Sequence, residues 1–254
     1  MTDKTGGVQS VERALSLLEK LAAQDEGMRL SDLATEVGLT VSTVHRLLTT
    51  LEQRGFVHAD PSSKRWHVGR SAFAVGAAFV RQRHFVAPAL PYLRRLRDAT
   101  RETANLGILE DGEVLTLSQV ESREITRAIS PPGGRVPMLN SGMGKAMLAT
   151  WDDAAIDGFL AAHRFERKTP RSLGDRAAVL AEIADIRARG YAVDDEEYVP
   201  GLRCVAAAVL GPQGEAVCAL SVSGLAARMT ADRVAETGRR IIALAGEFSG
   251  WLRG

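Results

Sequence analysis

Two turns of a predicted helix near the N-terminus carry polar side chains of several chemical kinds. They are Thr40, Ser42, Thr43, His45 and Arg46. Hydroxyl, imidazole and guanidinium groups at the start of a helix can reach base edges or phosphates when that helix enters the major groove of DNA. Lys64 and Arg65, further along, are adjacent cations suited to the phosphate backbone or the minor groove.

Charge is unevenly distributed along the chain. The net charge is only +1 over 254 residues, which gives no sign of a nucleic-acid partner. Between residues 40 and 70, however, the sequence has five cationic side chains and only two carboxylates, which gives a local net charge of +3. The cationic side chains of this stretch can therefore contact the phosphates of a nucleic acid.

A second polar set lies in the C-terminal half. Ser221 and Ser223 are two residues apart, so in a strand both point to the same face and their hydroxyls can converge on one oxygen-rich ligand. Asp194 and Cys204 complete the set. Each also has an ordinary explanation: a strand serine often satisfies a neighbouring carbonyl, a lone cysteine fills a core, and an aspartate in the acidic run 194–197 is solvated.

A glycine-rich segment precedes a predicted helix that begins near Lys145. Backbone amides around Gly142 and Gly144 suit an anion such as a carboxylate, although glycines at a turn more often serve backbone geometry.

The sequence shows no evident pattern of catalytic residues. Cys204 and Cys218 can lie on neighbouring strands, so an enzyme with Cys204 as its nucleophile is one alternative function. Against it, the C-terminal region holds a single histidine, His163, and neither a Ser-His-Asp set nor a metal-spaced cluster occurs. We therefore expect no catalytic residue, metal or cofactor. A module whose N-terminal helices contact another protein is a further alternative.

Three helices are predicted to position the first polar set. Residues 10–23 form an amphipathic helix capped by Ser10, and Ser31 caps a short second helix that ends at Gly38. Thr40 or Ser42 caps a third, whose apolar residues face a core. These are Val44, Leu47, Leu48 and Leu51. Such an arrangement, with a glycine in the turn, predicts a helix-turn-helix.

A hairpin is expected after the third helix. Residues 55–58 and 65–68 are predicted to form strands joined by a turn over 60–63. This hairpin would place Lys64 and Arg65 at the tip of a wing. A purely structural three-helix domain remains an alternative, and the basic hairpin counts against it.

Residues 71–82 form an apolar linker helix. Phe73, Val75, Phe79 and Val80 give it more apolar surface than a connecting helix can leave in water. This surface is covered either by a second subunit or by the helix's own domain.

The remaining chain mixes strands and helices. Helices are expected at 85–101, 175–189 and 231–252, the last capped by Thr230, and strands at 103–109, 114–120, 124–129, 136–139, 191–198, 205–210 and 216–222. Their hairpin order predicts an antiparallel sheet flanked by helices and therefore an α+β chain.

Two cysteines and a polar start indicate a cytoplasmic protein without a disulfide framework or signal peptide. The most apolar run is too short to span a bilayer, so we expect no membrane partner.

Several motifs resemble one family throughout the chain. They are VQSVERALSLLEKLA, LSDLATEVGLTVSTVHRLLTTLEQRGFV, WHVG, SGMGKAMLA, GYAVDDEEYVPGLRCVAAAV and ALSVSG. In this order and spacing they resemble the isocitrate-lyase-regulator (IclR) family of transcription factors. Thr40 departs from the proline often found there, which leaves the helix cap intact and affects only the expected base preference.

The resemblance implies a domain plan: a winged helix-turn-helix over 8–70, a linker helix over 71–86 that pairs subunits, and a GAF-like effector domain over 87–254. It further implies a repressor of a catabolic operon that binds palindromic double-stranded DNA as a homodimer or a dimer of dimers, and whose effector is a small organic acid. The implied effector residues are Ile125, Ala128, Val136, Gly142, Met143, Asp194, Leu202, Cys204, Ser221 and Ser223.

Overall fold

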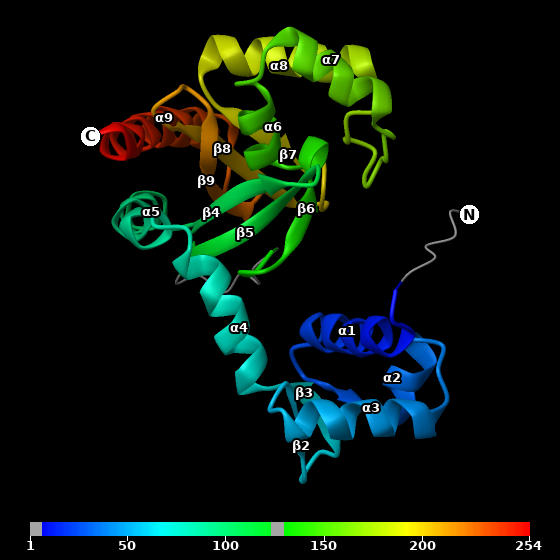
Figure 1. The fold of residues 1–254 in the computed structure, drawn as a ribbon. Coiled ribbons are helices and arrows are strands. Elements are labelled where there is room, and N and C mark those ends of the chain that lie inside the picture. The colour runs from blue at the N-terminus through cyan, green and yellow to red at the C-terminus, as the bar shows by residue number, and fades with distance from the viewer. Residues whose placement is uncertain (1–6, 123–129) are drawn as a thin grey trace. The chain divides into compact units, whose positions relative to one another are not determined.

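The computed structural model describes residues 7–122 and 130–254. The chain divides into two compact units whose boundary lies between Arg83 and His84 (Figure 1). Each unit has its own core and is described by itself.

Three helices form the body of the first unit: α1 (Gln9–Ala22), α2 (Leu30–Glu36) and α3 (Val41–Gln53). Their apolar sides meet in a core that includes Leu17, Leu33, Val44 and Leu48. The apolar residues at helical spacing within each helix therefore form the core of the predicted helix-turn-helix.

The helix starts differ in part from the prediction. Thr40 is the N-cap of α3, and its side chain accepts a hydrogen bond from the backbone N–H of Thr43 at 3.3 Å, as expected. Ser10 and Ser31 were wrong as caps. Because α1 begins at Gln9 and α2 at Leu30, both serines lie inside the first turn of their helix, and Ser31 donates to Asp32 instead.

A small antiparallel sheet completes this part of the unit. β2 (Val57–Asp60) and β3 (Arg65–Val68) form the predicted hairpin, and β1 (Met28–Arg29) adds a short strand to its other edge in the order β1-β3-β2. Buried Trp66 fastens the hairpin to the helical core.

Helix α4 (Arg70–Arg81) follows the hairpin and buries none of its residues. Phe73 and Val75 leave 78% and 62% of their surface exposed. The described chain therefore leaves this apolar face open to solvent.

The second unit is built on a six-stranded antiparallel sheet of order β6-β5-β4-β9-β8-β7. The strands are β4 (Thr103–Glu110), β5 (Glu113–Val120), β6 (Arg135–Pro137), β7 (Ala192–Asp195), β8 (Leu202–Leu210) and β9 (Ala216–Leu225). This confirms the predicted α+β class.

Helices cover both faces of the sheet. α5 (Val86–Thr100) and α9 (Ala231–Arg253) pack together on one face, and α6 (Gly142–Leu148) packs on the other (Figure 1). α8 (Arg176–Arg189) packs on α6, and both share a core with α7 (Asp153–Ala162). A short 3-10 turn, Met138–Asn140, leads into α6.

Some predicted elements of this unit require correction. The helix expected near Lys145 begins one turn earlier, at Gly142, because Ser141 caps it. α7 was not predicted, the segment 136–139 is only partly strand, and Thr230 precedes α9 without a side-chain cap bond. The strand expected at 124–129 lies outside the described residues.

Within residues 7–122 and 130–254, none of the helices combines the length and apolarity needed to cross a bilayer.

Candidate functional site

The outer side of α3 carries the first polar set. Ser42, His45 and Arg46 are exposed, whereas Val44 and Leu48 on the same helix are fully buried. The hydroxyls of Thr40 and Thr43 lie 2.9 Å apart. The helix thus has an apolar inner side and an accessible outer side that holds hydroxyl, imidazole and guanidinium groups.

An open groove of about 560 Å³ runs between α1 and α3. Besides Thr43, His45 and Arg46 of α3, it is lined by Gln9, Ser10 and Arg13 of α1. The sequence placed Arg13 only on the polar side of a helix, because the packing angle of two helices cannot be read from either one. Arg13 and Arg46 are the cations of this lining, and within the described chain no carboxylate lines the groove.

Asp60 fixes the turn at the tip of the β2–β3 hairpin. One carboxylate oxygen accepts from the N–H and hydroxyl of Ser62, and the other accepts from the hydroxyl of Ser63 at 2.6 Å. These hydrogen bonds hold the pKa of Asp60 well below its usual range, and the bond from Ser63 has the largest effect.

The two predicted wing cations have different surroundings. Lys64 is exposed and takes a left-handed backbone conformation with φ of 55°. Arg65 lies in β3 opposite Arg29, and its guanidinium donates to the carbonyl of Gly27 at 2.8 Å. Part of the donor capacity of Arg65 therefore holds the unit together, and its role at DNA stays a prediction.

A cavity of about 50 Å³ lies in the second unit between the sheet and the start of α6. The implied effector residues within the described chain all line it. They are Val136, Gly142, Met143, Asp194, Leu202, Cys204, Ser221 and Ser223. Ile125 and Ala128 lie outside the described residues.

Several further lining residues were missed by the sequence analysis. They are Thr103, Asn105, Thr116, Gln119, Ser130, Ser141 and Tyr198. Thr103 and Asn105 alternate with the apolar Ala104 and Leu106 in β4, a pattern that marks one polar face. Which strands lie beside that face depends on sheet order, and the sequence alone did not supply it.

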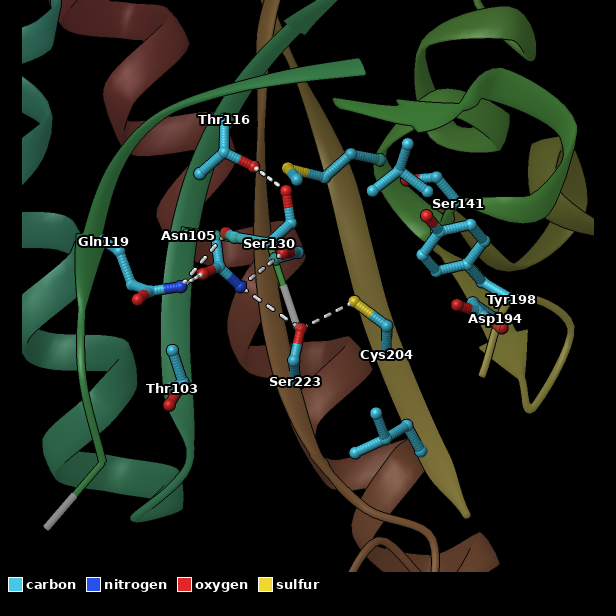
Figure 2. A pocket seen from close by; sticks show the side chains of 15 residues that line it. Thr103, Asn105, Thr116, Gln119, Ser130, Ser141, Asp194, Tyr198, Cys204 and Ser223 are labelled. Atoms are coloured by element: carbon cyan, nitrogen blue, oxygen red, sulfur yellow. Dashed lines mark hydrogen bonds between the residues drawn. The ribbon is translucent and has the colours of Figure 1, made fainter. Parts of the chain in front are cut away.

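Side-chain hydrogen bonds join the polar residues across the sheet (Figure 2). Asn105 Nδ2 donates to Ser221 Oγ at 3.1 Å and to Ser223 Oγ at 3.2 Å, and Gln119 Nε2 donates to Asn105 Oδ1 at 2.7 Å. Cys204 Sγ lies 3.0 Å from Ser223 Oγ. Asp194, Tyr198 and Ser141 approach from the opposite side of the cavity.

Asp194 lines this cavity and is largely buried, so the alternative that it is simply a solvated surface residue was wrong. Its Oδ1 accepts from the backbone N–H of Glu197 at 2.7 Å. Burial raises the pKa of Asp194 to about 7, and the negative charge of Glu197 contributes to the same shift.

The two glycines before Lys145 serve different purposes. A side chain at Gly144 would overlap the backbone carbonyl of Met138, so close approach of the chain explains this glycine. Gly142 lines the cavity and has ordinary contacts around it.

Neither cysteine has the environment of a nucleophile. Burial raises the pKa of Cys204 to about 11 and that of Cys218 to about 12, which leaves both as thiols near neutral pH. Ser223, whose Oγ lies 3.0 Å from Cys204 Sγ, is not a base. The structure therefore gives no support to the alternative of a Cys204-based enzyme.

Comparison with known families gives two matches in chain order. Residues 10–61 match the IclR helix-turn-helix domain, and residues 77–250 match the C-terminal domain of bacterial IclR transcriptional regulators.

Individual relatives cover nearly the whole chain. The HTH-type transcriptional regulator BhcR of Paracoccus denitrificans is 43% identical over 97% of this chain and 88% of its own length. The acetate operon repressor of Salmonella typhimurium is 39% identical over 96% and 90% respectively. The crystal structure of Thermotoga maritima IclR superposes with a TM-score of 0.82 at 25% identity, covering 97% of this chain and 99% of that one.

Proposed function

This chain belongs to the IclR family of bacterial transcriptional regulators, and from that premise we propose that it represses a catabolic operon and responds to a small organic acid. As a member of this family it is a DNA-binding, ligand-responsive regulator. Repression is supported by the acetate operon repressor among its relatives.

DNA binding is assigned to the exposed side of α3 together with the wing. The supporting observation is that Ser42, His45 and Arg46 face solvent while Val44 and Leu48 anchor the same helix in the core. These groups can enter a major groove without disturbing the fold. Thr40, Thr43, Lys64 and the remaining donors of Arg65 complete the proposed contact set.

The exposed apolar face of α4 is assigned to subunit pairing. Phe73 and Val75 are too exposed for a monomer to leave them in water without cost. A two-fold pair would present two α3 helices to a palindromic operator, as a homodimer or a dimer of dimers. Because its target is the chromosome, we place the protein in the cytoplasm.

The cavity of the second unit is assigned to the effector. Its volume of about 50 Å³ suits a ligand of a few heavy atoms, and its lining combines hydroxyl and amide groups with apolar walls. Within the described chain none of its lining side chains is a cation, so hydrogen-bond donors must recognise the acid.

We infer that effector binding shifts the placement of two DNA-binding units by favouring one of two subunit arrangements. A ligand achieves this only if its affinity differs between the arrangements.

An electrophoretic mobility assay with the intergenic DNA beside the protein's own gene tests the DNA assignment. The proposal requires a retarded band that weakens with salt and with Arg46→Ala. No retarded band with the wild-type protein would reject it in favour of a protein-interaction module.

A thermal-shift screen of small carboxylic acids tests the effector assignment. A bound acid raises the melting temperature of the wild type but not that of Asp194→Ala or Ser221→Ala. Equal shifts in all three proteins would place the acid elsewhere.

A further inference from the structure

A continuous polar line crosses five strands on the cavity face of the sheet. Gln119 of β5 is the cross-strand partner of Asn105 of β4, and Asn105 is the partner of Ser221 of β9. One step along, Ser223 pairs with Cys204 of β8, which pairs with Asp194 of β7. Asn105 lies on the second of these strands, between Gln119 and the two serines, and is 6% exposed.

The direction of the hydrogen bonds along this line is fixed at one end. Gln119 Nε2 lies 3.4 Å from the backbone carbonyl of Ser130, which can only accept. The same nitrogen lies 2.7 Å from Asn105, so the Asn105 atom facing it is the carbonyl oxygen. The Asn105 amide nitrogen must then face β9, where it donates one proton to each serine oxygen.

Each serine oxygen therefore accepts one hydrogen bond from Asn105, and its own proton points away from Asn105. Among the described residues, no backbone carbonyl accepts from Ser221 or Ser223, and the other group in hydrogen-bond contact with them is the thiol of Cys204, a weak acceptor. Both serines line the cavity. Both hydroxyl protons are therefore available to a stronger acceptor in the cavity, such as an oxygen that has no proton of its own.

We propose that Asn105 is the positioning residue that turns Ser221 and Ser223 into hydrogen-bond donors and thereby makes the cavity select a carboxylate over its neutral amide. This inference rests on the proposed effector function of the cavity. Asn105 acts through the two serines, and Gln119 holds the Asn105 amide in the required orientation.

The selectivity follows from what each ligand offers. A carboxylate oxygen accepts two hydrogen bonds and carries charge, so hydroxyl donors bind it more strongly than they bind a neutral carbonyl. A primary amide is neutral and brings two N–H donors of its own, for which each serine oxygen has only one lone pair left after accepting from Asn105.

Asn105→Asp reverses the polarity of the line without changing the shape of the side chain. A carboxylate at position 105 only accepts, so the serine protons turn toward it and the serine lone pairs face the cavity. Thr116→Asp is the charge-matched control, because Thr116 lines the same cavity and hydrogen bonds to Ser130 rather than to the serines of β9. Asn105→Ala removes the donor without adding charge.

The test is a ligand-observed NMR titration of the full chain at pH 6 with two isosteric pairs, acetate with acetamide and lactate with lactamide. Circular dichroism melting checks the fold of each variant. The wild type is expected to prefer the acids. Asn105→Asp should lose about 10- to 100-fold in acid affinity, clearly more than Thr116→Asp, while its amide affinity stays equal or rises. Asn105→Ala should weaken acid binding and leave amide binding unchanged.

Equal losses of acid affinity in Asn105→Asp and Thr116→Asp would show simple charge repulsion and overturn the proposal, as would an unchanged preference in Asn105→Ala. Both of those outcomes leave the effector cavity itself in place. A wild type that binds none of the acids would reject the organic-acid assignment together with this inference.

Discussion

Lys145 Nζ lies 2.5 Å from Glu197 Oε1, and both residues are buried, Lys145 with 1% of its side chain exposed. The same ammonium donates to the carbonyl of Val193 at 2.6 Å, which ties α6 to β7. Glu197 in turn donates its backbone N–H to Asp194 in the cavity wall. The pair therefore connects the two elements that bound one side of the cavity.

Lys145→Met should lower the free energy of unfolding by about 3–5 kcal/mol, because it leaves the Glu197 carboxylate buried without its partner. Urea denaturation at pH 7 measures the loss. Lys145→Met combined with Glu197→Met should recover most of it, since the buried charge is then removed as well. Arg176→Met is the control: its ion pair with Asp157 is half exposed, and its loss should cost about 1 kcal/mol or less. A Lys145→Met cost no larger than that of Arg176→Met would show that Lys145 does not stabilise the buried Glu197 carboxylate.

The carboxyl of Asp194 should make acid binding depend on pH. Its pKa of about 7 lies above the ordinary value, so the folded protein holds a proton there that a nearby anion would help to retain. Cys204 stays protonated over the same range, and Glu197 and Lys145 are the charged neighbours that enter the shift. Acid affinity is therefore expected to be highest below pH 7 and to fall by up to about tenfold per pH unit above it.

Calorimetric titrations with the best acid from pH 5.5 to 8.5 measure this dependence, with Asp194→Asn as the matched variant. The wild type should lose affinity across the range, and Asp194→Asn should give a flat profile. A steep profile that persists in Asp194→Asn would assign the proton to another group.

The same pKa affects folding. An acid whose folded pKa exceeds its unfolded value binds more protons in the native state, so Asp194 makes the unfolding free energy fall as pH rises between about 4 and 7. Asp194→Asn should therefore be more stable than the wild type at pH 8, relative to their difference at pH 5. Urea midpoints at the two pH values decide this, and parallel behaviour of the two proteins would refute it.

The exposed guanidinium of Arg46 should contribute directly to DNA affinity. Arg46→Ala is expected to weaken operator binding by about 1–3 kcal/mol if it reads a base, and to lower the salt slope by about one if it contacts a phosphate. Fluorescence anisotropy titrations at several salt concentrations separate the two cases. Lys20→Ala is the control, since that cation pairs with Glu36. Equal affinities for Arg46→Ala and the wild type would remove Arg46 from the interface.

The apolar face of α4 should hold subunits together. Phe73→Glu places a charge at the most exposed large apolar side chain of the helix and is expected to yield monomers in sedimentation velocity. Gln82→Glu adds the same charge just beyond the helix and should leave the wild-type assembly unchanged. If Phe73→Glu sediments like the wild type, α4 does not mediate the pairing.

The N-terminal unit could be predicted closely because its signals are local. Thr40 caps α3, apolar spacing places Val44 and Leu48 inside, and turn residues separate β2 from β3. These features depend on residues within a few positions of one another. The side chain of Arg65 could not be placed in this way, because its partner Gly27 is far away in the sequence.

The cavity could be predicted only in part. Ser221 and Ser223 share a face through simple alternation, but Asn105 and Gln119 join them only through the order and register of β5, β4 and β9. Lys145 is a similar case, since a lysine in a short helix gives no sign that it will be buried. The placement of these residues depends on pairing between segments that are far apart in the sequence. Local sequence patterns do not reveal that pairing.

A ligand bound in the second unit is expected to change the affinity of the first unit for DNA. The most direct test titrates a fluorescent operator with full-length wild type, with and without a saturating acid identified by thermal shift. The operator affinity should shift when the acid is present, and the acid affinity of the DNA-bound protein should change by the same factor. Operator affinity that stays constant while the acid demonstrably occupies the cavity would contradict it.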